Sequence, residues 1–211
     1  MGSENFNKIT GQNGPIVNGN KFTFDETLKQ FLQGGDYFDS ITSESATAQY
    51  TWVFHVNPVP GDVGGRIISK NFANTGGRSY AFFTNGTDNF RYILLNEAST
   101  SNTVADVTVT SSAPSSKVTI VIATDMTQAP GSRVTIWING VEDSQTDNFT
   151  NTGVVDDVSQ PLIIGGHKHH TGAYLQSHAY NGNIYEILLY NRLLTQADSV
   201  EYSNYMNTKF A

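Results

Sequence analysis

The stretch Tyr50-Thr51-Trp52-Val53-Phe54-His55-Val56, followed by Asn57-Pro58, decides the fold class of this chain. Aromatic and β-branched residues fill it, and these residue types favour the pleated, half-buried surface of a β-strand. Because successive side chains of a strand point to opposite faces, Trp52, Phe54 and Val56 share one face. The Asn-Pro pair is a turn signal that ends the strand. The stretch therefore predicts a strand that turns an apolar face toward a core.

Runs of the same kind recur along the chain, separated by Gly, Asn, Asp and Pro. The expected strands cover residues 66–70, 80–84, 90–95, 104–109, 117–123, 133–138, 162–164 and 183–190. Period-two alternation adds Ile120, Ile122, Ile136 and Ile138 to the predicted core. Asn139-Gly140, directly after one of these runs, predicts a hairpin turn. This regular alternation of short strands and turns is typical of an all-β sandwich or barrel.

Helical signals are few. Thr195 is a good helix N-cap, and Asp198 three residues later is favourable near a helix N-terminus. Residues 196–207 contain no Gly or Pro, so a short C-terminal helix is predicted there. A second short helix around Asp25 to Gln30 is an open alternative.

The composition narrows the classes of function. Charged residues make up 15% of the 211 residues, against roughly 25% in an average domain. Uncharged polar surfaces of this kind suit extracellular or virion β-proteins, and the formal net charge of −7 opposes nucleic-acid binding. The absence of cysteine excludes a disulfide framework and a thiolate metal site. No apolar run is long enough to insert in a membrane, and no signal peptide is visible at the N-terminus.

Residues 1–20 are polar and rich in Gly and Asn, and they are predicted to form an extended N-terminal arm before one domain at 21–211. The arm has too few apolar residues for a core of its own, because ordering each residue costs roughly 1–2 kcal/mol of backbone entropy. It must therefore lie either on an edge of its own sheet or on a neighbouring structural protein. The second alternative is preferred, with a homo-oligomer left open.

Three segments carry a resemblance to a known family. They are residues 32–39 (LQGGDYFD), 134–141 (VTIWINGV) and 181–192 (NGNIYEILLYNR). In this order and spacing they resemble the laminin-G-like members of the concanavalin A-like lectin/glucanase superfamily, over about residues 28–205. The resemblance implies an all-β, two-sheet antiparallel jelly-roll sandwich with a short C-terminal helix. It does not imply one function, because members bind glycans, proteins or calcium or serve as structural decoration.

Two kinds of metal site are candidates. The family's closing strand usually carries an Asp where this chain has Tyr185, whereas Glu186 matches. The opening and closing strands pair in the family, so Asp36, Asp39 and Glu186 would approach one another as calcium ligands. His167 and His169 lie two residues apart and would share a face if extended, as a transition-metal pair requires. A polar loop without any metal is the alternative for the histidines.

Glycan binding requires an exposed aromatic platform with amide and hydroxyl groups beside it. Candidates in two regions meet this description: Tyr174, Tyr180, Asn181, Asn183 and Tyr185, and separately Arg78 and Tyr80. Any one of these tyrosines would otherwise belong to the core or to a sheet surface.

Enzymes share this fold, but the glycosidase pattern of alternating carboxylates on one strand is absent from the sequence. We therefore expect a non-catalytic recognition or structural module. The preferred setting is the surface of a virion, as a phage decoration, fibre or tail protein that touches host glycans. The alternative is a secreted carbohydrate-binding or adhesion module of a larger protein, outside the cell.

Overall fold

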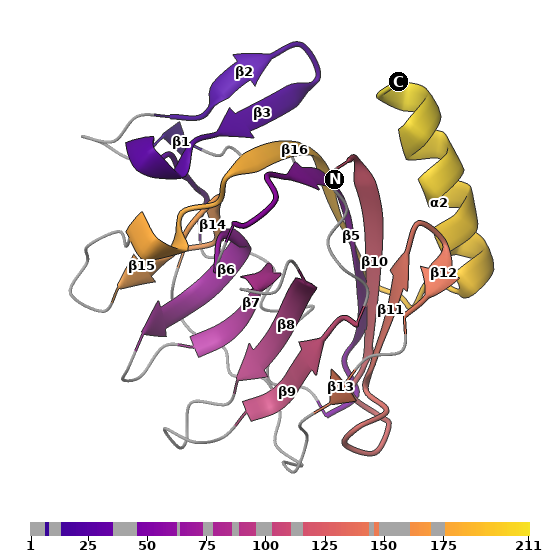
Figure 1. Cartoon of the computed structure of the whole chain (residues 1–211). Coiled ribbons are helices and arrows are strands. Elements are labelled where there is room, and N and C mark those ends of the chain that lie inside the picture. Colours follow the sequence, from indigo (N-terminus) through magenta and orange to yellow (C-terminus); the bar gives the residue numbers. More distant parts are fainter. Residues whose placement is uncertain are drawn as a thin grey trace.

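The computed structural model describes residues 7–8, 14–35, 46–62, 64–73, 78–85, 89–95, 103–110, 116–143, 146–147, 161–169 and 176–211. Two sheets face each other as the layers of a sandwich, and one helix lies beside the second sheet (Figure 1). The predicted two-sheet jelly-roll sandwich is confirmed. In the described part of the chain, no helix is long and apolar enough to cross a membrane.

The first sheet brings together strands from the whole length of the chain. Its order is β1 (Asn7–Lys8), β4 (Leu32–Gln33), β14 (Ile163–Ile164), β6 (Arg66–Ala73), β7 (Arg78–Asn85), β8 (Asn89–Leu95), β9 (Thr103–Thr108) and β13 (Thr146–Asp147). These neighbours are antiparallel, and β15 (Lys168–His169) adds a parallel pairing to β6.

The second sheet contains the stretch that decided the fold class. Its order is β12 (Val141–Glu142), β11 (Val134–Ile138), β10 (Val118–Asp125), β5 (Gln49–Pro58), β16 (Gly182–Tyr190), β3 (Lys21–Phe24) and β2 (Ile16–Asn18). All these pairings are antiparallel. Asn139 and Gly140 both have positive φ, which the two-residue hairpin between β11 and β12 requires.

The main core lies between the two sheets, where period-two alternation placed it. Trp52, Phe54, Ile120 and Ile136 are almost completely buried there. Val56 and Ile122 are buried with them, and Ile138 packs against the cluster from a partly buried position. The ring of Phe54 stacks on the ring of Phe82 from the opposite sheet with 4.7 Å between centroids, so aromatic contacts join the layers.

A second apolar cluster lies on the outer face of the second sheet, beneath α2 (Gln196–Lys209). Val53 and Trp137 from the sheet are buried against Met206 and Phe210 from the C-terminal segment. The helix begins at a capping box, in which the Thr195 hydroxyl accepts from the Asp198 amide and the Asp198 carboxylate accepts from Thr195. The predicted helix and its cap are confirmed. The open alternative near Asp25 is one 3₁₀ turn, η1 (Glu26–Leu28).

The described part of the predicted arm adds to the domain's own sheets. Residues 7–8 pair with β4 at one edge of the first sheet. Residues 16–18 form β2, which pairs with β3 in a hairpin at the edge of the second sheet. Gly19, at the turn of this hairpin, has φ of 60°, a conformation that glycine adopts without strain. These residues therefore occupy sheet edges, the less preferred of the two alternatives, and attachment to a neighbour stays a prediction.

One expectation taken from the resemblance is wrong. The opening strand β4 pairs with β1 and β14 in the first sheet, whereas the closing strand β16 pairs with β3 and β5 in the second. The physical reason is that residues 21–24 form a strand of their own and occupy the place beside β16. The opening and closing strands therefore do not pair.

Candidate functional site

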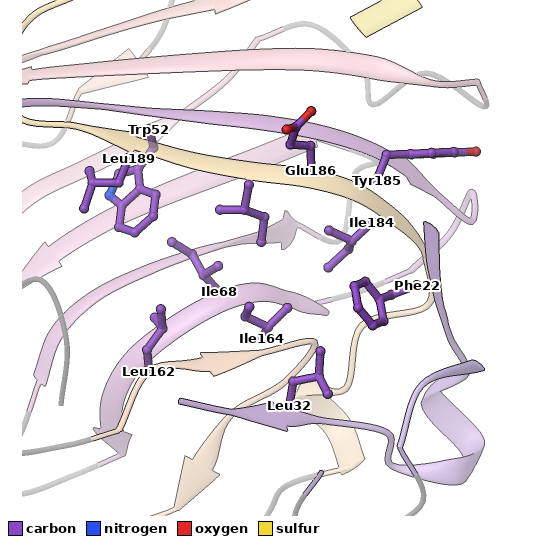
Figure 2. A pocket seen from close by; sticks show the side chains of 11 residues that line it. Phe22, Leu32, Trp52, Ile68, Leu162, Ile164, Ile184, Tyr185, Glu186 and Leu189 are labelled. Atoms are coloured by element: carbon purple, nitrogen blue, oxygen red, sulfur yellow. The ribbon is translucent and has the colours of Figure 1, made fainter. Parts of the chain in front are cut away.

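A β-bulge in β16 determines where Tyr185 lies. The register with β5 shifts between Ile184, which faces Val56, and Glu186, which faces His55. Ile184 and Ile187 pack in the core between the sheets, while Tyr185 packs against the outer cluster beneath α2. Figure 2 shows Ile184 pointing into the space between the sheets, with Tyr185 and Glu186 pointing elsewhere. The extra residue thus turns two consecutive polar side chains away from the core.

Tyr185 borders a polar pocket of about 300 Å³ on this outer face. We call it the Tyr185 pocket. Its lining residues come from the β2–β3 hairpin, the segment before β10, β16 and the C-terminal end of α2: Asn18, Asn20, Lys21, Lys117, Tyr185, Lys209, Phe210 and Ala211. The volume is at the lower end of the range for small-ligand sites, so the pocket has room for one or two sugar rings.

Lysine ammonium groups surround the ring of Tyr185. Lys21 Nζ lies 5.9 Å from the ring centroid and Lys117 Nζ lies 5.7 Å from it. Both distances are within the range of a cation–π contact, worth about 0.5–1 kcal/mol at exposed sites. Two positive side chains therefore lie beside this ring, although the whole chain carries a net charge of −7.

Part of this positive charge is already compensated. Lys209 Nζ lies 2.8 Å from Glu186 Oε2 and 3.0 Å from Oε1, and this hydrogen-bonded pairing raises the pKa of Lys209. Lys117 Nζ donates a hydrogen bond to the backbone carbonyl of Phe210, near the C-terminal end of α2. Lys21 has its cation–π contact with Tyr185 and, among the described residues, no carboxylate partner. Lys21 and Lys117 thus have no carboxylate side-chain partner within the described part of the chain.

His55 supports the pocket from beneath. Its ring lies 5.2 Å from that of Tyr185 and stacks on that of Phe210 at 5.4 Å. The side chain is buried, and His55 Nδ1 shares a hydrogen bond of 3.0 Å with Thr119 Oγ1. Burial, together with the nearby positive charge of Lys117, lowers the pKa of His55 to about 4. The imidazole is therefore neutral near pH 7 and holds the two aromatic rings without adding charge.

This lowered pKa predicts a loss of stability in acid. An unfolded histidine titrates near pH 6.5, so lowering the pH from 7 to 5 protonates His55 in the unfolded state but not in the folded one. The free energy of unfolding should fall by about 2 kcal/mol from this group over that interval. Chemical unfolding at both pH values should show this fall in the wild type and a smaller one in His55→Gln. Equal pH dependence in the two proteins would show that His55 titrates normally.

A second cavity lies between the sheets on the inner side of β16 (Figure 2). Its volume is about 280 Å³, and apolar side chains form most of its wall: Phe22, Leu32, Trp52, Ile68, Leu162, Ile164, Ile184, Ile187 and Leu189. A cavity with so few polar groups offers little to orient a sugar. The polar chemistry is therefore on the outer face, in the Tyr185 pocket.

The predicted glycan-binding residues do not form one group. Tyr180 and Tyr80 are completely buried, so the prediction that either ring is an exposed platform is wrong. Both rings belong to the core between the sheets, where Tyr180 packs edge-on against Phe24. Tyr174 and the side chain of Arg78, on β7, lie outside the described residues.

The two predicted asparagines lie near Tyr185 along the chain, and each makes a hydrogen bond within the fold, Asn183 through its side chain and Asn181 through its backbone amide. Asn183 accepts a 2.8 Å hydrogen bond from the hydroxyl of Thr23, which joins β16 to β3. The backbone amide of Asn181 donates to Asp62 Oδ2 at 3.2 Å. Of the predicted glycan-binding residues, Tyr185 alone borders the pocket, within the part of the chain described here.

The metal candidates are dispersed. Asp36 and Asp39 lie outside the described residues. Glu186 is ion-paired with Lys209. His167 is buried, with its ring 5.1 Å from that of His178, and His169 lies on β15 with its side chain outside the description. Within the described ranges, no three metal-ligating side chains come together. Calcium and transition-metal binding therefore stay predictions.

The sequence-based selection missed the residues that surround Tyr185. Lys21, Lys117 and Lys209 lie more than 90 positions apart along the chain and meet only through the sheet order and α2. One available signal was the Asn18-Gly19-Asn20-Lys21 turn, which places a cation and two amides next to a sheet edge.

Comparison with known proteins supports the fold. A family model described as the concanavalin A-like lectin/glucanases superfamily matches residues 32–198. No curated protein matches the sequence. Solved structures match at low identity, beginning with a native heptameric SAP-like pentraxin from Limulus polyphemus. That match has 14% identity and a TM-score of 0.54, and it covers 90% of this chain and 79% of the pentraxin.

Two toxin structures superpose more closely. The binding domain of Paraclostridial Mosquitocidal Protein 1 matches with a TM-score of 0.64 and 13% identity, over 96% of this chain and 48% of that one. Botulinum neurotoxin type C, which depends on interaction with two ganglioside molecules to enter cells, matches with a TM-score of 0.63 and 11% identity, over 96% and 46%. This chain thus spans about half the length of the toxin chains. From the family match over most of its length, the chain belongs to the concanavalin A-like lectin/glucanase superfamily.

Proposed function

We propose that this chain is a non-catalytic carbohydrate-binding module and that the Tyr185 pocket is its glycan site. The observation that carries the proposal is a half-buried aromatic ring, held from behind by His55 and Phe210 and bordered by amides and ammonium groups. The apolar face of a sugar ring stacks on such a platform, while Asn18 and Asn20 supply donors and acceptors for hydroxyl groups. The family match and the toxin binding domains among the similar structures support this class of function.

The chemistry of the pocket supports binding without hydrolysis. Glycosidases of the common kind use two carboxyl groups about 5–9.5 Å apart across the scissile bond. Among the described side chains that border or adjoin the Tyr185 pocket, Glu186 is the acidic one, and it is occupied by Lys209. A single carboxylate side chain does not supply the pair that this chemistry requires.

The test is glycan binding by Tyr185 variants. A glycan panel screened against the wild type, followed by calorimetry with the best ligand, should give saturable binding. Tyr185→Ala removes the platform and should weaken that binding at least about tenfold. Tyr185→Phe keeps the ring and serves as the matched control, with affinity within about threefold of wild type.

Thermal unfolding of each variant shows whether the fold is intact. Unchanged affinity in Tyr185→Ala would move the glycan site elsewhere. Release of reducing sugar from any panel member, abolished by changing a carboxylate, would contradict the non-catalytic proposal.

The biological setting is a separate part of the proposal. We place the module on a virion surface, as a decoration, fibre or tail protein, with the secreted adhesion module as the alternative. Ile16 and Val17 support attachment through residues 1–20, because they are 59% and 68% exposed on the edge strand β2, and an open edge accepts further strands. Cross-linking in the native source should join residues 1–20 to a neighbouring structural protein or a second copy. Cross-links confined to one chain would contradict this attachment.

A further inference from the structure

We infer that the Tyr185 pocket selects a saccharide that carries an acid group, a carboxylate or a sulfate, on or next to the ring that stacks on Tyr185. This inference rests on the proposed function and specifies its ligand class. It is carried by the placement of Lys21 and Lys117, two ammonium groups that lie 5.9 Å and 5.7 Å from the same ring and have no carboxylate side-chain partner among the described residues.

The first step is the local sign of the charge. The chain has 19 acidic residues against 12 lysines and arginines, yet three of those 12 converge on this one pocket. Glu186 compensates Lys209, which leaves two ammonium groups on the wall. A local group of positive side chains in a molecule of negative net charge attracts anions to that place.

The second step separates this arrangement from simple capping of α2. Lysines near a helix C-terminus commonly neutralise its last carbonyls, and Lys117 and Lys209 do lie at that end. Lys21 comes from β3, which lies on the other side of β16 from β10 in the sheet, and its described contact is with the ring of Tyr185. Capping therefore accounts for Lys117 and Lys209 but not for the position of Lys21 beside the Tyr185 ring.

The third step concerns donors. An ammonium group has three N–H donors. Lys117 donates one of them to the Phe210 carbonyl. The contact described for Lys21 is with the Tyr185 ring, and it uses none of these donors on an acceptor among the described residues. Hydrogen bonds from such groups to an anionic oxygen are about twice as strong as those between neutral groups. A neutral sugar on Tyr185 would displace water from both cations without compensating their charge, which costs free energy.

The experiment compares acidic saccharides with their neutral parents by calorimetry, at about 50 mM and about 500 mM salt. The probes are sialyllactose against lactose, a galacturonate trisaccharide against its methyl ester, and a sulfated heparin tetrasaccharide against its desulfated form. The variants are Lys21→Gln, which removes the charge, and Lys21→Arg, which keeps it. Lys29→Gln is the matched control, because Lys29 is partly exposed and outside the pocket.

We expect at least one acidic probe to bind about tenfold or more tightly than its neutral parent, with weaker binding at high salt. Lys21→Gln should lose about fivefold to tenfold in affinity for the acidic probe, and Lys21→Arg and Lys29→Gln should lose little. The pattern across the three pairs distinguishes carboxylate from sulfate. Equal affinities within every pair, or no effect of Lys21→Gln, would overturn the inference while glycan binding at Tyr185 stands. Absence of binding to any saccharide would reject both.

Discussion

Replacing Phe54 with alanine should lower the free energy of unfolding by about 3–5 kcal/mol. The side chain is completely buried between the sheets. It stacks on Phe82 at 4.7 Å and on Trp52 at 5.8 Å. Removing it loses the transfer free energy of the ring, leaves a cavity, and breaks an aromatic contact that joins the two layers. Urea-induced unfolding followed by tryptophan fluorescence gives the difference directly.

Phe22→Ala is the matched control for Phe54→Ala. Phe22 lies on β3 beside the inner cavity and is 38% exposed. Because much of this ring already faces solvent or open space, its removal should cost less than about 1.5 kcal/mol. A loss at Phe22 as large as that at Phe54 would contradict the placement of the core between the sheets.

Gly165→Ala should destabilise the protein by about 2–5 kcal/mol. Gly165 has φ of 81°, a backbone conformation that alanine adopts at a cost, and an added Cβ would overlap the ring of Phe24. The position cannot shift easily, because its amide donates to Ile67 at 3.0 Å and its carbonyl accepts from Tyr180 at 2.9 Å. The melting temperature of the variant measures the effect.

Gly131→Ala isolates the contribution of the overlap. Gly131 has a similar φ of 87°, but an added Cβ there has nothing within 4 Å. It should therefore cost only the backbone strain, about 1–2 kcal/mol. If both alanine variants were equally stable, the close packing of Phe24 against Gly165 would be wrong.

The fold was predictable because its determinants are local. Alternating apolar residues in 50–56, 118–122 and 134–138 are enough to place strands and their core faces. Asn139-Gly140 adopts the positive φ values that its turn requires, and Thr195 with Asp198 forms the expected helix cap. In each of these cases, residues adjacent in sequence decide the outcome.

The candidate site was harder to predict because its determinants are not local. The sequence does not distinguish Tyr180 from Tyr185. In the structure, the bulge after Ile184 turns Tyr185 to the outer face of the sheet, whereas Tyr180 is buried in the core. The lysines come together only when β3, β10 and α2 are placed around β16. The strand of residues 21–24 pairs with β16 in the place expected for the opening strand of residues 32–39. No short motif in the sequence indicates this pairing.

The most direct test of glycan binding at the Tyr185 pocket is its location on the protein by two-dimensional NMR. A ¹⁵N-labelled sample titrated with the best panel ligand should show amide shifts that cluster at Asn20, Lys21, Tyr185 and Phe210, with the tyrosine ring protons shifting as a sugar stacks on them. Shifts that cluster instead at the opposite sheet, or around His167 and His178, would contradict the assignment of the glycan site to this pocket.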